Sequence, residues 1–170
     1  MIILEGADGT GKSTLAHYIS STYKYQIFHC SYSKDWNIEM YHRLLLHTAG
    51  KLEEQANVPV IIDRWALSEL VYGRQFRDGA SYNVEKIIQE AIDAYNPKFV
   101  ICTNDNVQRN FEKLANEREE MYHNASSIQE EYLLQIATGQ YGKKYYKYDY
   151  DKDRMFEFCQ QVLNLQEKAK

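Results

Sequence analysis

The stretch of sequence that decides the fold is "EGADGTGKST", which runs from Glu5 to Thr14. Four residues separate Gly6 from the run of Gly11, Lys12 and Ser13, which is the GxxxxGK[ST] pattern. Glycines let the backbone curl so that successive N–H groups point inward at oxygen atoms. The pattern therefore predicts a phosphate-binding loop, or P-loop, provided that a strand precedes it and a helix follows it.

Both flanking elements are predicted from the residues around the loop. Residues 1–4, "MIIL", form a short apolar run that is typical of a buried strand. Residues 12–23 carry apolar and aromatic side chains at helical spacing, and the positive end of such a helix attracts phosphate. In this context Lys12 is expected to neutralise the β and γ phosphates of a nucleotide, and Ser13 to give its hydroxyl to Mg²⁺.

The rest of the chain alternates between strand and helix patterns. Further strands are predicted at residues 25–30, 58–63, 98–103 and 143–150. Further helices are predicted at residues 37–55, 67–72, 84–95, 107–116, 128–138 and 153–166. The helix at 128–138 is expected to start with a capping box made by Ser127 and Glu130. This alternation predicts one α/β domain over residues 1–170, a three-layer α/β/α fold with a mostly or fully parallel five-stranded sheet.

Composition narrows the classes of function. A net charge of −4 in 170 residues argues against a general polyanion binder, because a nucleic-acid groove usually shows as a basic excess. Cys30, Cys102 and Cys159 are far apart and lack CxxC spacing, which argues against a disulfide framework or a zinc site. With no apolar run long enough to span a bilayer and no leader pattern, we expect a cytoplasmic protein without a membrane partner.

A second motif narrows the P-loop class. Asp63 and Arg64 follow the apolar run at 58–63, in "IIDRWALSELVYG". A carboxylate at the end of a strand beside the P-loop is placed to hold Mg²⁺. An adjacent arginine can grip a second anion in two places, which a GTPase does not need. The stretch at 103–106, "TNDN", also lacks the lysine of a guanine-reading NKxD motif. The two motifs together predict phosphoryl transfer between two small molecules.

The motifs resemble those of a known family. "EGADGTGKST", then "DRWALSELVYG", then "ERE" at 117–119 followed by Glu120, are similar to the motifs of the thymidylate kinase family of deoxynucleoside monophosphate kinases. The resemblance runs from residue 3 to about residue 135. It implies a P-loop kinase fold with a small helical lid at about residues 109–127, and transfer of the γ-phosphoryl group of ATP, with Mg²⁺, to a deoxynucleoside monophosphate. Members of the family often form two-fold dimers, so a homodimer is an open expectation.

The resemblance also implies roles for individual residues. The ATP-binding residues would be Gly6, Asp8, Gly9, Thr10, Gly11, Lys12, Ser13 and Thr14. The metal-binding residues would be Ser13 and Asp63. The acceptor-binding residues would be Asp8, Arg43, Arg64, Ser68 and Tyr72, and Glu69 is added as a candidate because it lies beside Ser68. The catalytic residues would be Lys12, Arg64, Arg118 and Asp8.

Three of these assignments have competing explanations. Ser68 matches a residue that lines the acceptor base and sugar, or it occupies a plain helix position. Asp8 matches the carboxylate that faces the acceptor's 3′-hydroxyl and phosphate, or it is a turn residue that bonds its own backbone. Arg43 lies twenty residues before Asp63, where the family has an arginine that reads a pyrimidine carbonyl, or it is a solvated helix arginine. Tyr72 matches an aromatic residue that crowds out a 2′-hydroxyl.

Departures from the family pattern leave the acceptor base open. Residues 29–36, "HCSYSKDW", replace an Arg-Glu-Pro-Gly-Gly type segment, and Glu39 stands where a phenylalanine commonly stacks on thymine. Trp36 or Tyr41 could supply the aromatic face instead. A buried Glu69 could accept from the ring N–H and amino group of guanine, and an exposed Glu69 would read nothing. The leading acceptor by resemblance is dTMP, with dUMP, a modified pyrimidine nucleotide and dGMP as alternatives.

Three other functions remain open at this point. A polynucleotide 5′-end kinase would need a basic approach channel, and a nucleoside kinase would need a general base near Arg64. A nucleotide-binding module without turnover would need neither the acceptor arginine nor the lid.

A lid arginine is predicted to complete the site. Some family members carry an arginine inside the P-loop, where this chain has Gly9, so Arg118 is expected to match the charge on the transferred phosphoryl group. Arg109 and Lys113 are weaker candidates for contacts with ATP. Because such an arginine contributes about 10³ to 10⁵ in rate, Arg118→Ala should slow single-turnover transfer far more than it weakens ATP binding. Small and equal effects on both quantities would remove Arg118 from the mechanism.

Overall fold

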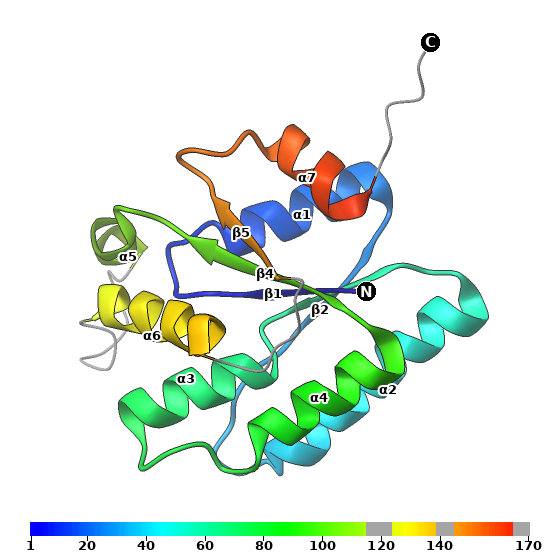
Figure 1. Ribbon diagram of the computed structural model, residues 1–170, viewed down its shortest axis with the longest axis horizontal. Coiled ribbons are helices and arrows are strands. Elements are labelled where there is room, and N and C mark those ends of the chain that lie inside the picture. Colours follow the sequence, from blue (N-terminus) through cyan, green and yellow to red (C-terminus); the bar gives the residue numbers. More distant parts are fainter. Residues whose placement is uncertain (115–123, 139–144, 165–170) are drawn as a thin grey trace.

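The computed structural model describes residues 1–114, 124–138 and 145–164, and these form a parallel sheet with helices on both faces (Figure 1). The strands are β1 (Ile2–Glu5), β2 (Gln26–His29), β3 (Val60–Asp63), β4 (Lys98–Thr103) and β5 (Tyr145–Asp149). Their order is β2-β3-β1-β4-β5, and every neighbouring pair is parallel. The predicted five-stranded α/β/α architecture is confirmed, and its sheet is fully parallel.

The helices divide between the two faces (Figure 1). One face carries α1 (Lys12–Tyr23) and α7 (Met155–Leu163). The other face carries α2 (Ile38–Ala56), α3 (Ala66–Phe76), α4 (Val84–Tyr95), α5 (Val107–Leu114) and α6 (Ala125–Thr138). Each face has its own apolar cluster, because alternate side chains of the buried strands point in opposite directions. None of the described helices is both long and apolar enough to cross a membrane.

The central position of β1 brings the two predicted motifs together. β1 is buried along its length and pairs with β3 on one side and β4 on the other. The register sets Leu4 opposite Asp63, so the P-loop and the Asp63–Arg64 pair leave the sheet at neighbouring carboxyl ends. In open parallel sheets this edge is where ligands bind.

Two helix boundaries differ from the predictions. α3 continues to Phe76, four residues beyond the predicted end at residue 72. α6 begins at Ala125, and the side chain of Asn124 accepts a hydrogen bond from the backbone N–H of Ser127 at 3.0 Å. The predicted capping box of Ser127 and Glu130 is therefore wrong, because an asparagine three residues upstream already satisfies that N–H.

The first turn of the P-loop generates a stability prediction. Gly6 has a φ of 138°, and a Cβ atom there would lie 2.3 Å from the backbone oxygen of Cys102 in β4. Gly79 has a similar φ of 125°, but a Cβ atom there would have no neighbour within 4 Å. Backbone strain alone costs about 1–3 kcal/mol, so Gly79→Ala should lose about that much unfolding free energy.

We expect Gly6→Ala to lose clearly more than Gly79→Ala, because the backbone of β4 cannot move aside without breaking the sheet. Urea unfolding of the two variants beside the parent chain measures the difference. Equal losses would mean that the close approach to Cys102 adds nothing to the strain.

Candidate active site

A cavity of about 530 Å³ opens beside the P-loop, in the size range of small-molecule sites. Asp8 of the P-loop lines one part of it, residues from the end of β2, the following loop and α2 line another, and residues after β3 and along α3 line a third, including Arg64, Ser68, Tyr72 and Arg77. Four residues of the predicted acceptor site, Asp8, Arg64, Ser68 and Tyr72, are therefore brought together. Glu69 also reaches the cavity wall.

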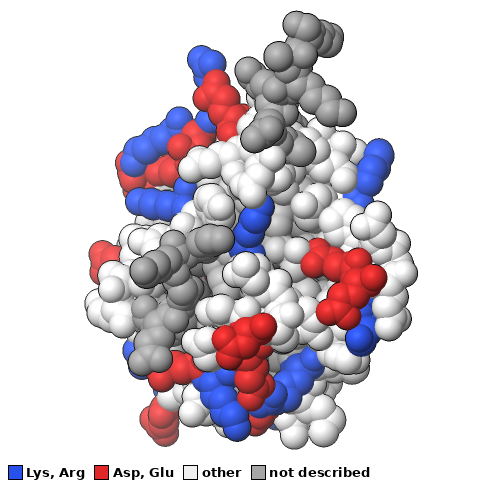
Figure 2. Space-filling view, turned by 45° about the vertical axis from the view of Figure 1, so that its right-hand side comes forward, with Lys and Arg blue, Asp and Glu red and all other residues white. Residues whose placement is uncertain are grey.

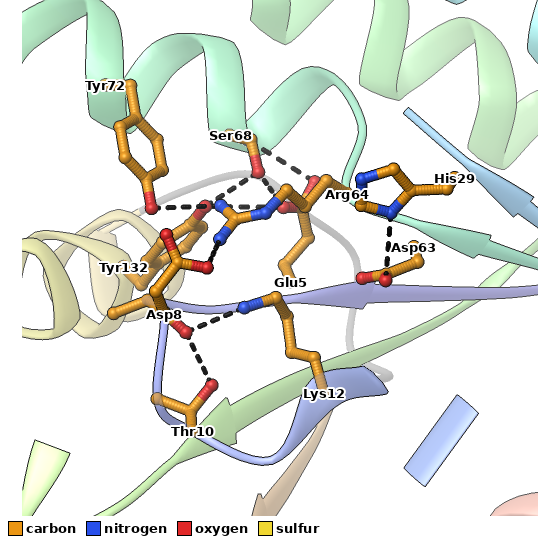
Figure 3. A network of polar contacts seen from close by, with 11 residues as sticks. Glu5, Asp8, Thr10, Lys12, His29, Asp63, Arg64, Ser68, Tyr72 and Tyr132 are labelled. Carbon is orange, nitrogen blue, oxygen red and sulfur yellow. Dashed lines mark hydrogen bonds and ion pairs between the residues drawn. The ribbon is translucent and has the colours of Figure 1, made fainter. Parts of the chain in front are cut away.

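Lys12 lies folded over the P-loop. Its ammonium group donates to the backbone oxygen of Ala7 at 2.7 Å, and the hydroxyl of Thr10 donates to the same oxygen at 2.7 Å (Figure 3). Burial and the nearby guanidinium of Arg64 lower the pKa of Lys12 to about 8, although the carboxylate of Asp8 opposes them. Burial and Arg64 thus disfavour the charged form of Lys12. The negative charge of a bound nucleotide phosphate would stabilise that form.

Arg64 links the P-loop to the cavity (Figure 3). Its Nη2 donates to Oδ1 of Asp8, and its Nη1 donates to the hydroxyl of Tyr72 at 2.9 Å. Burial favours the neutral form of Asp8, but the charges of Arg64 and Lys12 outweigh it and lower the pKa of that carboxyl. Arg64 therefore lines the cavity as a fully charged group with a planar set of donors.

The backbone of Arg64 is strained. Its φ is 66°, in the left-handed region that non-glycine residues rarely adopt. The other four described non-glycine residues with positive φ are helix C-caps, where this conformation is common: Lys24, Asn57, Asn96 and Asn164. Strain of this kind persists where the surroundings fix it, and it gathers at functional sites.

Asp63 has an oxygen suited to a cation. Its Oδ2 contacts Nδ1 of His29 at 3.1 Å, and His29 lines the cavity. Its Oδ1 is buried and finds no hydrogen-bond partner in the part of the chain that the structure describes. A buried carboxylate oxygen without a donor is costly. Asp63 therefore fits the predicted metal role, with Ser13 in the first turn of α1 as the other candidate ligand.

Glu5 is a member of the site that sequence reasoning missed. It is fully buried, and it accepts hydrogen bonds from the backbone N–H of Trp65 at 3.0 Å and from the hydroxyl of Ser68 at 2.5 Å (Figure 3). Burial raises the pKa of Glu5, while the bond from Ser68 and the charge of Arg64 oppose that rise. One signal was available: an ionisable residue closes the apolar run "IILE" of β1. Ser68 thus bonds to Glu5 as well as facing the cavity.

Glu69 is buried, which excludes the exposed side chain that was one of its two alternatives. Its Oε1 accepts from the backbone N–H and the hydroxyl of Ser81 at 2.9 and 2.8 Å, and its Oε2 accepts from Nη2 of Arg77 at 2.8 Å. Both oxygens are served by the protein itself. Direct reading of guanine by Glu69, the other alternative, is therefore not supported by the geometry.

Arg43 is not brought to the cavity. Its guanidinium, 40% exposed, pairs with Glu39 at 3.0 Å and with Glu90 of α4. The prediction that Arg43 reads the acceptor base is therefore wrong. Arg43 is the solvated helix arginine of the alternative explanation, because α2 turns this side chain towards α4. Trp36 and Tyr41 pack on each other, with ring centroids 5.2 Å apart, and neither lines the cavity.

A neutral polar cluster forms another part of the cavity wall. His42 contacts the hydroxyl of Tyr82 and lies 3.1 Å from the thiol of Cys30. Burial lowers the pKa of His42 to about 4 and raises the pKa of Cys30 to about 12. Both groups are uncharged near neutral pH, so the charge lining the cavity comes mainly from Asp8, Arg64, Arg77 and the buried Glu69.

The space beside Gly9 explains why this position carries no side chain. Its φ is 80°, and a Cβ atom there would lie 3.0 Å from the backbone nitrogen of Phe111 in α5. An arginine inside this P-loop would therefore need α5 to shift. Arg118, the predicted substitute, lies outside the described residues, as does much of the predicted lid at 109–127. Arg109 is an exposed residue of α5, and its predicted contact with ATP stays a prediction.

Comparison with known proteins gives one partial sequence relative. No family model matches the chain. The SPbeta prophage-derived uncharacterized protein YorR of Bacillus subtilis (strain 168) is 38% identical over 81 residues, which cover 46% of this chain and 45% of YorR. The chain thus matches less than half the length of this curated relative.

Solved structures match over almost the whole chain. YorR from Bacillus subtilis, in complex with phosphorylated GDP, superposes with a TM-score of 0.64 and 28% identity, covering 96% of this chain and 93% of that one. Deoxyadenosine kinase from M. mycoides with bound dATP has a TM-score of 0.58 and 16% identity, covering 96% and 98%. The same enzyme with bound dCTP has a TM-score of 0.55 and 18% identity, covering 96% and 99%. The chain therefore has a P-loop, nucleoside kinase-like fold.

Proposed function

We propose that this protein is an ATP-dependent kinase that transfers the γ-phosphoryl group to a deoxynucleoside monophosphate. The observation that carries the proposal is the position of Arg64. A fully charged arginine lines a small-molecule cavity and contacts Asp8 of the P-loop, so a second phosphate bound there would lie close to the first. A site that binds only the phosphates of one nucleotide at its P-loop does not need an arginine placed to bind a second anion at two points.

On the donor side, the P-loop backbone and Lys12 would hold the triphosphate of ATP. Lys12, with its pKa lowered to about 8, gains a strong counter-charge when phosphates bind beside it. Ser13 and Asp63 would hold Mg²⁺, which supplies further positive charge to the β and γ phosphates. Release of the bond from Lys12 to Ala7 would free the ammonium group for the transferred phosphoryl group.

On the acceptor side, Arg64 would leave Asp8 in part and bind the monophosphate. An oxygen of that phosphate forms the new bond to the γ-phosphorus as the bond to the β–γ bridging oxygen breaks, and ADP leaves. The acceptor oxygen carries negative charge near neutral pH and needs no base. Catalysis then consists of alignment and charge compensation by Lys12 and Arg64, with Asp8 between the two phosphate sites.

The sugar and base of the acceptor would lie along α3. Tyr72 presents its ring and hydroxyl to the cavity next to Arg64, which supports the predicted preference for a sugar without a 2′-hydroxyl. The motif resemblance favours dTMP, and dUMP or a modified pyrimidine nucleotide would fit the same description. The phosphorylated GDP bound in the YorR structure adds support for a guanine nucleotide.

A nucleoside is the second candidate for the acceptor. His29 lies on the cavity wall and its Nδ1 contacts Asp63, so a histidine oriented by a carboxylate is available to take the proton of a 5′-hydroxyl. A polynucleotide end is less well supported, since Lys, Arg, Asp and Glu side chains lie interspersed over the face shown in Figure 2.

A panel assay distinguishes these functions. The protein is incubated with ATP, Mg²⁺ and each ribo- and deoxynucleoside, as monophosphate and as free nucleoside, and ADP formation is followed with coupling enzymes. We expect conversion of deoxynucleoside monophosphates and no conversion of nucleosides. Conversion of nucleosides instead would make a nucleoside the acceptor and the His29–Asp63 pair the candidate base. ATP binding without any conversion would leave a binding module.

The role of Arg64 predicts a separable kinetic effect. Arg64→Lys keeps the charge and loses the two-point grip, so we expect kcat/KM for the monophosphate to fall about 10- to 100-fold with ATP binding nearly unchanged. Arg74→Lys is the matched control, because Arg74 pairs with Glu131 at 3.2 Å and does not line the cavity. Similar behaviour of the two variants would exclude Arg64 from acceptor binding.

A further inference from the structure

A second arginine lines the same cavity. Arg77 follows directly after α3, whereas Arg64 lies just before it, so the two arginines flank a helix of 11 residues, about 16 Å long. No role was predicted for Arg77 from the sequence. If the proposed function holds, Arg64 takes the acceptor phosphate, and the guanidinium of Arg77, which lines the same cavity, is available to a different part of the acceptor.

Glu69 fixes the position of Arg77. The carboxylate of Glu69 is 2% exposed, one turn before Tyr72 on α3, and it bonds to Nη2 of Arg77 at 2.8 Å. Its other oxygen holds Ser81 in the loop that follows. A carboxylate is buried at this cost only with strong partners. The buried charge therefore ties the guanidinium of Arg77 back over α3, towards the cavity.

Tyr32 sets the plane of that guanidinium. The ring of Tyr32 lies under it, 4.4 Å from ring centroid to Cζ, in a cation–π contact. A guanidinium carries five N–H donors in a fixed fork, and Glu69 accepts from one nitrogen. Tyr32 also forms a hydrogen bond with this guanidinium. The donors that remain can serve an acceptor on a ligand, because the Arg77 side chain is 28% exposed where it borders the cavity.

We propose that Arg77 reads the base of the acceptor nucleotide and selects bases with a carbonyl group on that edge. Guanine offers O6 and N7 to an arginine fork, and thymine or uracil offers O4. Adenine and cytosine present an amino group at the equivalent position. This group is a hydrogen-bond donor, so it cannot accept from the N–H groups of Arg77. Trp65, Tyr72 and Phe76 supply the apolar wall along which such a base lies. This inference rests on the proposed function, whose acceptor it specifies.

A purely structural explanation of the same contacts is that Arg77 only anchors residues 77–81 to α3. The two explanations differ in what happens when the arginine is removed. An anchor affects stability and all acceptors alike, whereas a base reader affects carbonyl-bearing acceptors through KM and leaves the others nearly unchanged.

The test compares Arg77→Met with the matched control Arg74→Met. Methionine keeps an unbranched apolar stem and removes the fork. The acceptors are dGMP, dTMP, dUMP, dAMP and dCMP, with kcat and KM from the coupled assay and Kd for each monophosphate from titration calorimetry. Thermal unfolding verifies that both variants fold. A third variant, Arg77→Lys, keeps the charge but not the fork.

We expect the parent chain to prefer at least one of dGMP, dTMP and dUMP over dAMP and dCMP. In Arg77→Met the KM for the preferred acceptor should rise about 10- to 100-fold, with dAMP and dCMP changed less than about 3-fold. Arg77→Lys should recover only part of the preference, and Arg74→Met should match the parent chain. A base preference that survives in Arg77→Met, or a parent chain that prefers dAMP or dCMP, would overturn the inference.

The calorimetry separates this inference from the proposed function. If no monophosphate is converted, the proposed function fails. The inference then stands if carbonyl-bearing monophosphates still bind and Arg77→Met weakens only them. It fails if their Kd values are unchanged in Arg77→Met or if no monophosphate binds. If the parent chain and Arg77→Met both convert monophosphates with the same base preference, the inference about Arg77 fails and the proposed function stands.

Discussion

The buried carboxylate of Glu5 is the interaction on which the site depends. Glu5 ends β1, immediately before the P-loop, and it accepts from Trp65 and Ser68 at the start of α3. A fully buried carboxylate is stable only while those donors stay in place. The contact therefore fixes the start of α3 relative to the P-loop, and Arg64, which lies between β3 and α3, is held in a left-handed conformation facing Asp8.

Two helices then divide the work of the site. α1 begins directly after Gly11 of the P-loop, and in the proposed function its positive end would face the donor phosphates. α3 runs beside the cavity with an arginine before its first residue and another after its last. Its first turn carries Glu69, whose buried charge draws the guanidinium of Arg77 back along the helix. In the proposed function, donor and acceptor recognition would thus belong to separate elements that meet at Asp8.

Local patterns predicted the fold and half of the site. The strands were predictable because buried parallel strands are continuous apolar runs, and the P-loop and Asp63–Arg64 motifs lie where such runs end. Arg43 was wrongly assigned to the acceptor site. Its distance from Asp63 along the sequence does not determine the direction in which its side chain leaves α2. Glu5 and Arg77 were missed because their roles come from pairing at a distance: Glu5 with Ser68, and Arg77 with Glu69 across the end of a helix that was predicted too short.

The packing of α5 against Gly9 limits how this site can change. A Cβ atom at position 9 would lie 3.0 Å from the backbone nitrogen of Phe111, so a side chain there would press on α5. A side chain here would also have to adopt the left-handed backbone conformation of Gly9, which residues other than glycine rarely adopt. A cation introduced at position 9, by evolution or by design, would therefore strain the loop unless α5 adjusts with it.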